Sequence, residues 1–223
     1  NAILGIIPFG SGNGFARHLK IPSGAVNAIK LLNNPKLLSV DTGRINNHIF
    51  VNVAGTGFDA HIAHLFPKSG QRGFYGYSKL VLSEFYRYKS LNYSIACNGI
   101  SFTRSAFLMS FANGSEFGSG TTIAPKASVR DNLLDVCILK KFPLTRSPDL
   151  IMRLFTNTIN RSPFYERIQT TQIIVEQHGI NKTLVHLDGE FVFIEGNSFE
   201  VNLQPHSLKV IQGSVKGNNI PLF

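Results

Sequence analysis

The chain has 223 residues, of which 43% are hydrophobic, and a formal charge of +9 at pH 7. It contains no apolar run of about eighteen residues, so we expect no membrane-spanning helix. Its two cysteines, Cys97 and Cys137, lack metal-ligand spacing and indicate reduced core residues of a cytosolic protein. The positive charge favours binding of anionic lipid or of phosphorylated ligands, and the alternative is a basic surface that only keeps the protein soluble. The Lys and Arg residues are scattered, and the sequence has no RNA-binding signature, which argues against nucleic acid as a binding partner.

The first residues predict alternating strand and helix. Ile3–Ile7 has the composition of a buried strand, and Phe15–Lys20 predicts a short helix. That helix should end at Ile21 because the following proline disfavours α geometry in the residue before it. Ser23 is the expected cap of a second helix over Ala25–Leu32.

The remainder predicts mainly antiparallel strands. The expected strands are Leu37–Arg44, His48–Val53, Tyr93–Cys97, Ile100–Thr103, Ser105–Phe111, Leu134–Leu139, Ile168–Glu176, Thr183–Leu187, Glu190–Ile194, Ser198–Leu203 and Leu208–Ile211. Helices are expected between Gly73 and Ser90 and over Pro148–Thr158. In the first of these, Phe74, Tyr77, Val81, Phe85 and Tyr88 form an aromatic and apolar stripe that indicates core packing, with the border of an acyl-chain groove as the alternative.

These elements predict an α/β fragment followed by a mainly antiparallel β-sandwich with inserted helices. The expected divisions are residues 1–38 for the α/β remnant, 39–205 for the sandwich, and 206–223 for a final strand and tail that can return to the first domain. Because a buried-type strand follows Asn1 almost at once, we expect an upstream portion of the protein to precede this chain.

A glycine-rich turn follows the first strand and carries the strongest chemical signal. Gly10, Ser11, Gly12 and Asn13 lead directly into a helical segment. Such a strand–turn–helix exposes backbone N–H groups to a phosphate, and glycine permits the close approach of a ligand. The alternative is a tight connection that binds nothing.

Four segments together resemble a known family. Gly10-Ser11-Gly12-Asn13 with Phe15-Ala16-Arg17, Phe50–Ala60, Ala124–Asp135 and Leu187-Asp188-Gly189-Glu190 occur in the order of the diacylglycerol kinase catalytic family, which includes bacterial lipid kinases and sphingosine kinases. The resemblance implies a nucleotide domain and a β-sandwich, as in NAD kinase-like folds, with the active site between them. It also implies ATP and Mg²⁺ as cofactors and assigns Gly10, Ser11, Gly12 and Asn13 to ATP binding.

The Asp188-Gly189-Glu190 turn is the predicted catalytic site. A kinase that acts on an alcohol needs a carboxylate to orient or deprotonate the attacking hydroxyl. From the tripeptide alone, an Asp-Gly hairpin followed by an exposed glutamate is the simpler interpretation. The family places its general base in this motif, so the resemblance assigns Glu190 as proton acceptor, with Asp188 as its partner and the rival for that role.

A second carboxylate site lies in the segment around Asp131. Oxygen ligands from a turn suit Mg²⁺, whereas an Asx turn before a strand is the alternative. By resemblance, a structural magnesium would take the Asp131 carboxylate and the carbonyls of Ser128 and Leu133. Many bacterial members carry aspartate where this chain has Gly14, which puts the catalytic magnesium in doubt. Asp59 is expected to cap the helix that follows it, or to meet a substrate hydroxyl.

We therefore predict an ATP-dependent lipid kinase that phosphorylates diacylglycerol or a sphingoid base, located in the cytoplasm and peripheral to an anionic membrane. A non-catalytic lipid- or nucleotide-binding module is the alternative, and kinship with NAD kinases fits the motifs less well. This chain alone should be weakly active because the family's upstream phosphate loop is absent from it. Nucleic acid is not an expected partner, and a homodimer stays open. All of this requires the Asp188–Glu190 turn to face the N-terminal glycine turn across a shared crevice.

Overall fold

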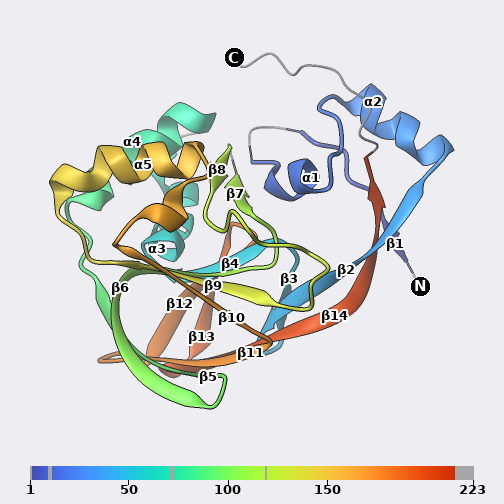
Figure 1. Ribbon diagram of the computed structural model, residues 1–223. Coiled ribbons are helices and arrows are strands. Elements are labelled where there is room, and N and C mark those ends of the chain that lie inside the picture. Colours follow the sequence, from blue (N-terminus) through green and yellow to red (C-terminus); the bar gives the residue numbers. More distant parts are fainter. Residues whose placement is uncertain (1, 10–11, 71–72, 119, 214–223) are drawn as a thin grey trace.

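A computed structural model describes residues 2–9, 12–70, 73–118 and 120–213 (Figure 1). In these residues twelve strands form one strongly curled sheet, and β7 and β8 form a separate two-stranded ribbon. The strands are β1 (Ile3–Leu4), β2 (Lys36–Ile45), β3 (His48–Phe50), β4 (Val53–Gly57), β5 (Leu91–Cys97), β6 (Ile100–Ala112), β7 (Glu116–Gly118), β8 (Thr121–Thr122), β9 (Leu134–Lys140), β10 (Tyr165–Thr170), β11 (Gln172–Gln177), β12 (Lys182–Leu187), β13 (Glu190–Glu195) and β14 (Ser198–Gln212).

The sheet curls because two long strands take part in both of its layers. The first half of β6 pairs with β5, whereas its second half lies between β4 and β9. Strand β14 pairs first with β11 and β2, and its end pairs with β2 and with β1. All these pairings are antiparallel except that of β1 with β14, which is parallel. The interior of the curl is filled by the main apolar cluster, which includes Phe50, Tyr93, Met109 and Phe111.

Helices cover the outer side of the β4–β6–β9 part of the sheet. They are α3 (Phe58–Leu65), α4 (Gly73–Phe85) and α5 (Ser147–Phe155). Phe58, Phe107 and Leu150 belong to the second apolar cluster, which lies between these helices and the sheet. The N-terminal helices α1 (Gly14–His18) and α2 (Ala25–Lys30) lie at the opposite end, beside β1 and the end of β14 (Figure 1).

Short 3₁₀ turns complete the helical segments. They cover Leu31–Asn33, Phe66–Ser69, Leu144–Arg146 and Ile159–Arg161. The helix expected up to Ser90 ends at Phe85, and within its stripe Val81, Phe85 and Tyr88 pack against the second cluster. The side chain of Phe74 lies outside the described residues. None of the helices in the described ranges is long and apolar enough to cross a bilayer.

The predicted fold class is confirmed, but several predicted boundaries were wrong. The first strand, β1, covers only Ile3–Leu4 and is exposed rather than buried. The strand expected at His48–Val53 ends at Phe50, with Val53 beginning β4, and Gly24 rather than Ser23 is the N-cap of α2. The predicted strand Ile168–Glu176 is two strands, β10 and β11, that pair with different neighbours. The strands expected at Ser198–Leu203 and Leu208–Ile211 are one strand, β14, with an irregularity between Gln204 and Leu208. The two short strands expected between residues 100 and 111 are likewise the single strand β6. The domain divisions at residues 38 and 205 stay a prediction.

Candidate functional site

The glycine turn begins the site at the N-terminal end of α1. Gly10 and Ser11 lie outside the described residues, and Gly12 and Asn13 lead into the helix. The Gly14 N–H donates to the Gly12 carbonyl at 2.8 Å, and the Arg17 N–H donates to the Asn13 carbonyl at 3.1 Å. Asn13 is therefore the N-cap residue of α1. ATP binding by this turn stays a prediction.

Gly14 has a packing reason to be glycine in this chain. A Cβ built on Gly14 would lie 2.9 Å from the Glu116 carbonyl oxygen and 3.3 Å from Nδ2 of Asn52. The first of these contacts is with backbone, which cannot rotate away as a flexible side chain would. An aspartate at this position therefore has no room here without a shift of β7.

The carboxylate of Asp188 is held by the backbone that joins β3 to β4. Its Oδ2 accepts the Val51 N–H at 2.8 Å, and its Oδ1 accepts the N–H groups of Asn52 at 2.8 Å and Val53 at 3.0 Å. Asp188 has φ 52° and Gly189 has φ 98°, so the two-residue turn between β12 and β13 is left-handed at both positions. These three donors occupy both oxygens of the carboxylate and fix its orientation.

Asn52 connects this turn to the N-terminal segment. Its backbone N–H bonds to Asp188, and its side-chain Nδ2 donates to the Glu116 carbonyl at 2.8 Å. The same Glu116 carbonyl and the same Asn52 amide are the atoms against which Gly14 packs. The structure thus brings the end of the glycine turn and the Asp188 turn to opposite sides of one residue.

The carboxylate of Glu190, unlike that of Asp188, is exposed and has no hydrogen-bond partner among the described residues. Glu190 is the first residue of β13, pairs with Leu187 across the turn and is exposed. Within the described part of the chain, no side-chain hydrogen bond or ion pair holds its carboxylate. Of the two predicted catalytic acids, Glu190 is the one whose oxygens are available to a substrate.

A pair formed by the buried His186 and the partly buried Asp59, next to this turn, escaped the sequence analysis. His186 Nε2 lies 3.1 Å from Asp59 Oδ2, and the Ser110 hydroxyl donates to the same oxygen at 3.2 Å. A Cβ on Gly55 would lie 2.5 Å from that oxygen and 2.9 Å from His186 Nε2, so glycine is needed between them. The expected helix-capping role of Asp59 was wrong, because Gly57 is the N-cap of α3 and no side chain caps it.

Arg17 and His18 of α1 also lie against the sandwich. Arg17 Nε pairs with Glu116 Oε2 at 2.7 Å, and His18 Nδ1 lies 3.1 Å from the Ser115 hydroxyl. Burial lowers the pKa of His18 below its ordinary value of 6.5, although the charge of Glu116 opposes the shift. In the sequence analysis Arg17 appears only as part of a motif. Its ion pair with Glu116 could not be predicted, because the two residues are far apart in the sequence.

The predicted magnesium ligands lie in an exposed turn before β9. Asp131 Oδ1 accepts the Leu133 N–H at 3.2 Å, which is the Asx turn given above as the alternative. The turn is fixed by Asp41, which is fully buried: its N–H donates to the Val129 carbonyl and its Oδ2 accepts the Asn132 N–H. One carboxylate and nearby carbonyls are hard oxygen donors, so Ser128, Asp131 and Leu133 suit Mg²⁺ by chemistry. Among the described residues no cluster of three His, Cys, Asp or Glu side chains suits a metal.

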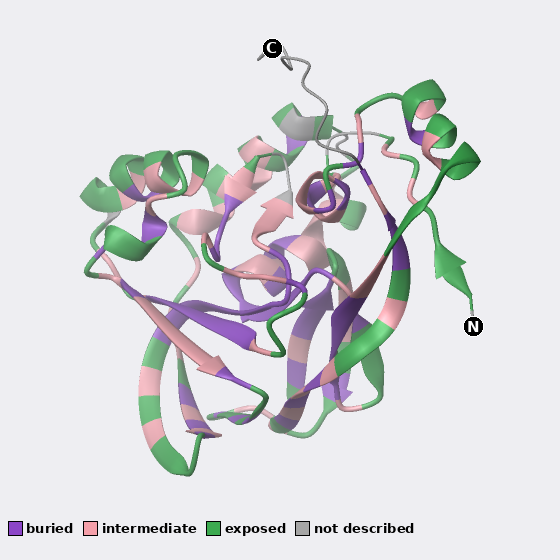
Figure 2. Ribbon diagram, turned by 45° about the vertical axis from the view of Figure 1, so that its right-hand side comes forward, coloured by how far each residue is buried: buried purple, intermediate pink, exposed green. Residues whose placement is uncertain are grey.

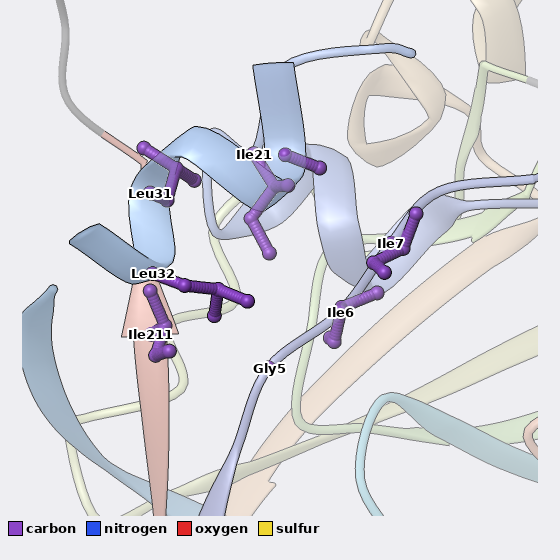
Figure 3. A pocket seen from close by; sticks show the side chains of 8 residues that line it. Gly5, Ile6, Ile7, Ile21, Leu31, Leu32 and Ile211 are labelled. Atoms are coloured by element: carbon purple, nitrogen blue, oxygen red, sulfur yellow. The ribbon is translucent and has the colours of Figure 1, made fainter. Parts of the chain in front are cut away.

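An apolar cavity of about 140 Å³ lies away from these polar groups (Figure 3). It is lined by Gly5, Ile6 and Ile7, by Ile21, Leu31 and Leu32, and by Ile211 near the end of β14. Its position between the N-terminal segment and β14 makes it part of their packing, and we do not assign it to the site.

Comparison with known proteins assigns the family. Residues 52–212 match the profile of the YegS C-terminal NAD kinase beta sandwich-like domain, and residues 1–45 match that of the diacylglycerol kinase catalytic domain. The first match alone covers more than half of the chain. The chain belongs to the YegS-like diacylglycerol kinase family. The predicted family membership is confirmed.

Individual relatives agree with this family assignment. A protein of Chromohalobacter salexigens named "Probable lipid kinase YegS-like" is 28% identical over 208 residues, which are 92% of this chain and 65% of that protein. One of Yersinia enterocolitica with the same name is 26% identical over 92% of this chain and 68% of its own length. The chain thus spans about two thirds of the length of these relatives.

Solved structures of the family share the fold. A candidate diacylglycerol kinase from Bacillus anthracis strain Sterne superposes with a TM-score of 0.74 over 96% of this chain and 69% of its own, at 22% identity. A diacylglycerol kinase from the same strain gives a TM-score of 0.67 at 19% identity. At these identities the likeness establishes the fold alone.

Proposed function

We propose that the natural protein containing this chain is an ATP-dependent kinase that phosphorylates the hydroxyl of a lipid such as diacylglycerol or a sphingoid base. The observation that carries the proposal is the contact made by Asn52, which links the Asp188 turn to Gly14 at the end of the glycine turn. This contact supports the proposal because phosphoryl transfer needs the two motifs close together. The lipid kinase names of the relatives support the class of reaction.

Glu190 is the proposed proton acceptor. A group that orients or deprotonates an attacking hydroxyl must present a free oxygen to it. The three N–H groups bonded to Asp188 leave its carboxylate little capacity for that role, whereas Glu190 is exposed two residues later. Asp188 then acts as a positioning residue that fixes the turn from which Glu190 projects.

The remaining groups of the proposed mechanism bind rather than react. Gly12 and Asn13, with Gly10 and Ser11 of the same turn, are assigned to the phosphates of ATP. Arg17 lies in the helix that follows that turn, where its guanidinium is already paired with Glu116. Ser128, Asp131 and Leu133 would hold a magnesium ion that stabilises the turn before β9. When bound there, the ion supplies charge to order the segment.

The test is phosphoryl transfer from labelled ATP to a panel of lipid alcohols, with the complete natural protein. Glu190→Gln should lower kcat about 100-fold or more while leaving the Kd for ATP unchanged. Glu195→Gln is the matched control, since Glu195 is an exposed glutamate at the other end of the same strand and should keep full turnover. Asp188→Asn should lower both turnover and thermal stability.

Two outcomes would overturn the proposal. Normal turnover of the Glu190→Gln variant would show that the base assignment is wrong. Binding of ATP or lipid without any phosphorylated product from the wild-type protein would support the non-catalytic module, which the missing aspartate at position 14 favours.

A further inference from the structure

Residues 1–40 of the chain contain no acidic side chain. They hold four Lys and Arg residues, and the first Asp or Glu in the sequence is Asp41. Any carboxylate that this chain places beside the glycine turn must therefore come from a later segment. In the structure that segment is β7, which lies next to α1 and begins with Glu116 (Figure 1).

The side chain of Glu116 lies next to the place where a side chain of residue 14 would begin. A Cβ built on Gly14 would lie 3.4 Å from the Cβ of Glu116 and 2.9 Å from its carbonyl oxygen. About one helical turn further along α1, the Arg17 Nε–H donates to Oε2 of Glu116 at 2.7 Å. The carboxylate of Glu116 therefore stands beside the helix that follows the glycine turn, and the side chain is 22% exposed.

The ion pair of Glu116 differs from a second Arg–Glu pair of similar burial. The side chain of Glu166 in β10 is 21% exposed, and that of its partner Arg104 is 35% exposed, as is that of Arg17. Arg104 binds both oxygens of Glu166, at 2.9 Å each, and Lys140 adds a further contact. Arg17 binds only Oε2 of Glu116, and the structure shows no partner for Oε1 among the described residues. Glu166 is therefore saturated by its cations, whereas Glu116 keeps an oxygen for a ligand.

Asn52 supplies a second oxygen at the same place. It is 7% exposed, and its Nδ2 donates to the Glu116 carbonyl at 2.8 Å. Its Oδ1 is buried and has no hydrogen-bond partner among the described residues. Because buried polar atoms are rarely left without a partner, this oxygen indicates an ion, a water or a ligand group at this point. The backbone N–H of Asn52 holds Asp188, so the point lies between the glycine turn and the Asp188 turn.

We propose that Glu116 is the carboxylate with which this chain faces the Mg²⁺ ion of bound ATP, and that Arg17 positions it. Mg²⁺ in nucleotide sites takes few protein carboxylates and completes its shell with phosphate oxygens and water. A free carboxylate oxygen beside the glycine turn satisfies that requirement. Carboxylates that bind metals are themselves held by hydrogen bonds, and Arg17 supplies one to Glu116. The identity of the nucleotide rests on the proposed function.

The charge of Glu116 distinguishes this role from a structural one. A carboxylate repels the phosphates of metal-free ATP and attracts the Mg²⁺ ion of Mg–ATP. Removal of that charge should therefore weaken the binding of Mg–ATP but not that of metal-free ATP. If Glu116 only held Arg17 in place, its loss would act through the shape of the glycine turn and would weaken the binding of both forms alike.

The test is calorimetric titration of the complete natural protein with ATP, in excess Mg²⁺ and again in EDTA. Glu116→Gln should raise the Kd of Mg–ATP about tenfold, and the Kd of metal-free ATP should stay equal or fall. Glu116→Asp keeps the charge on a shorter side chain and should retain part of the effect of Mg²⁺. Arg17→Met removes the same ion pair but keeps the carboxylate, so Mg²⁺ should still lower the Kd of ATP. Glu166→Gln is the matched control and should change neither Kd.

The outcomes separate this inference from the kinase proposal. Equal weakening of both forms of ATP in Glu116→Gln, or an effect of Mg²⁺ that is lost as fully in Arg17→Met, would overturn the assignment of Glu116. Binding that depends on Mg²⁺ and is unchanged in Glu116→Gln would overturn it too, and would leave the kinase proposal intact. If Mg²⁺ strengthens ATP binding through Glu116 but no lipid alcohol is phosphorylated, the kinase proposal alone fails. Absence of ATP binding by the wild type would count against both. Circular dichroism melting checks that the variants fold.

Discussion

The sandwich and the N-terminal segment, residues 2–33, achieve order in different ways. The sandwich encloses a continuous apolar cluster contributed by strands on both sides of the curl. The N-terminal segment contributes few buried side chains, and much of it is exposed (Figure 2). The side chain of Phe9, for example, is 91% exposed. A segment with so little buried apolar area of its own gains its stability from contacts with its neighbour.

Several contacts join the two regions, among them the contact of His18 with Ser115 and an apolar cluster in which Leu19 and Ile21 pack with Val40 and Val210. Strand β1 pairs with the end of β14, the Gly213 N–H donates to the Leu19 carbonyl at 2.9 Å, and Arg17 pairs with Glu116. We infer that the sandwich determines where the glycine turn lies, and that the turn can be loosened without unfolding the sandwich. Three predictions test this difference.

The largest effect is expected from Gly43→Ala in the sandwich. A Cβ at Gly43 would overlap the ring of Phe50, which is fully buried in the main cluster. The ring cannot leave without opening a cavity, so the free energy of unfolding should fall by about 3 kcal/mol or more. Urea denaturation followed by circular dichroism measures the loss. Gly12→Ala is the control, because a Cβ at Gly12 meets nothing within 4 Å. Equal midpoints for the two variants would contradict the prediction.

A smaller and local effect is expected from Gly213→Ala at the junction. A Cβ there would overlap the backbone of Lys20 and lie 2.9 Å from the Ile21 nitrogen. The end of β14 must then separate from the N-terminal segment, at a local cost of about 1–2 kcal/mol. Hydrogen exchange should become faster in peptides that cover residues 14–21 and stay unchanged in β4 and β6. Faster exchange throughout the sandwich would show that the two regions unfold together.

Sequence patterns predicted those parts of the fold that depend on side-chain alternation or on turn residues. Ile173 and Val175 alternate with exposed residues in β11, and the Asn98-Gly99 pair forms the turn between β5 and β6. The break after Thr170 was missed because the residues on both sides of it favour strand, and only their different partners separate β10 from β11.

The sequence predicted the local turn of the candidate site but not the residues that contact it, because those contacts join distant parts of the chain. The Asp188–Glu190 turn is local, and its motif marks it. The partners of Asp188 are three backbone N–H groups more than 130 positions away in the sequence, and backbone donors leave no trace in residue identity. Similarly, His186 and Asp59 meet only because β12 pairs with β4, a register that no local pattern reveals.

The smallest effect concerns pH at the contact between α1 and β7. Burial lowers the pKa of His18, so the folded protein favours the neutral ring, while the unfolded chain takes up a proton near the ordinary value of 6.5. The stability that depends on neutral His18 is therefore complete above that value and is lost as the pH falls below it. His18→Gln should flatten the pH dependence of unfolding between neutrality and about pH 5, whereas His48→Gln, at an exposed position of β3, should not. If only the N-terminal segment loosens at low pH, wild type and His18→Gln should differ in the hydrogen exchange of residues 14–21 alone. If the free energy of unfolding of wild type and of His18→Gln falls equally as the pH is lowered, a titratable group other than His18 is responsible.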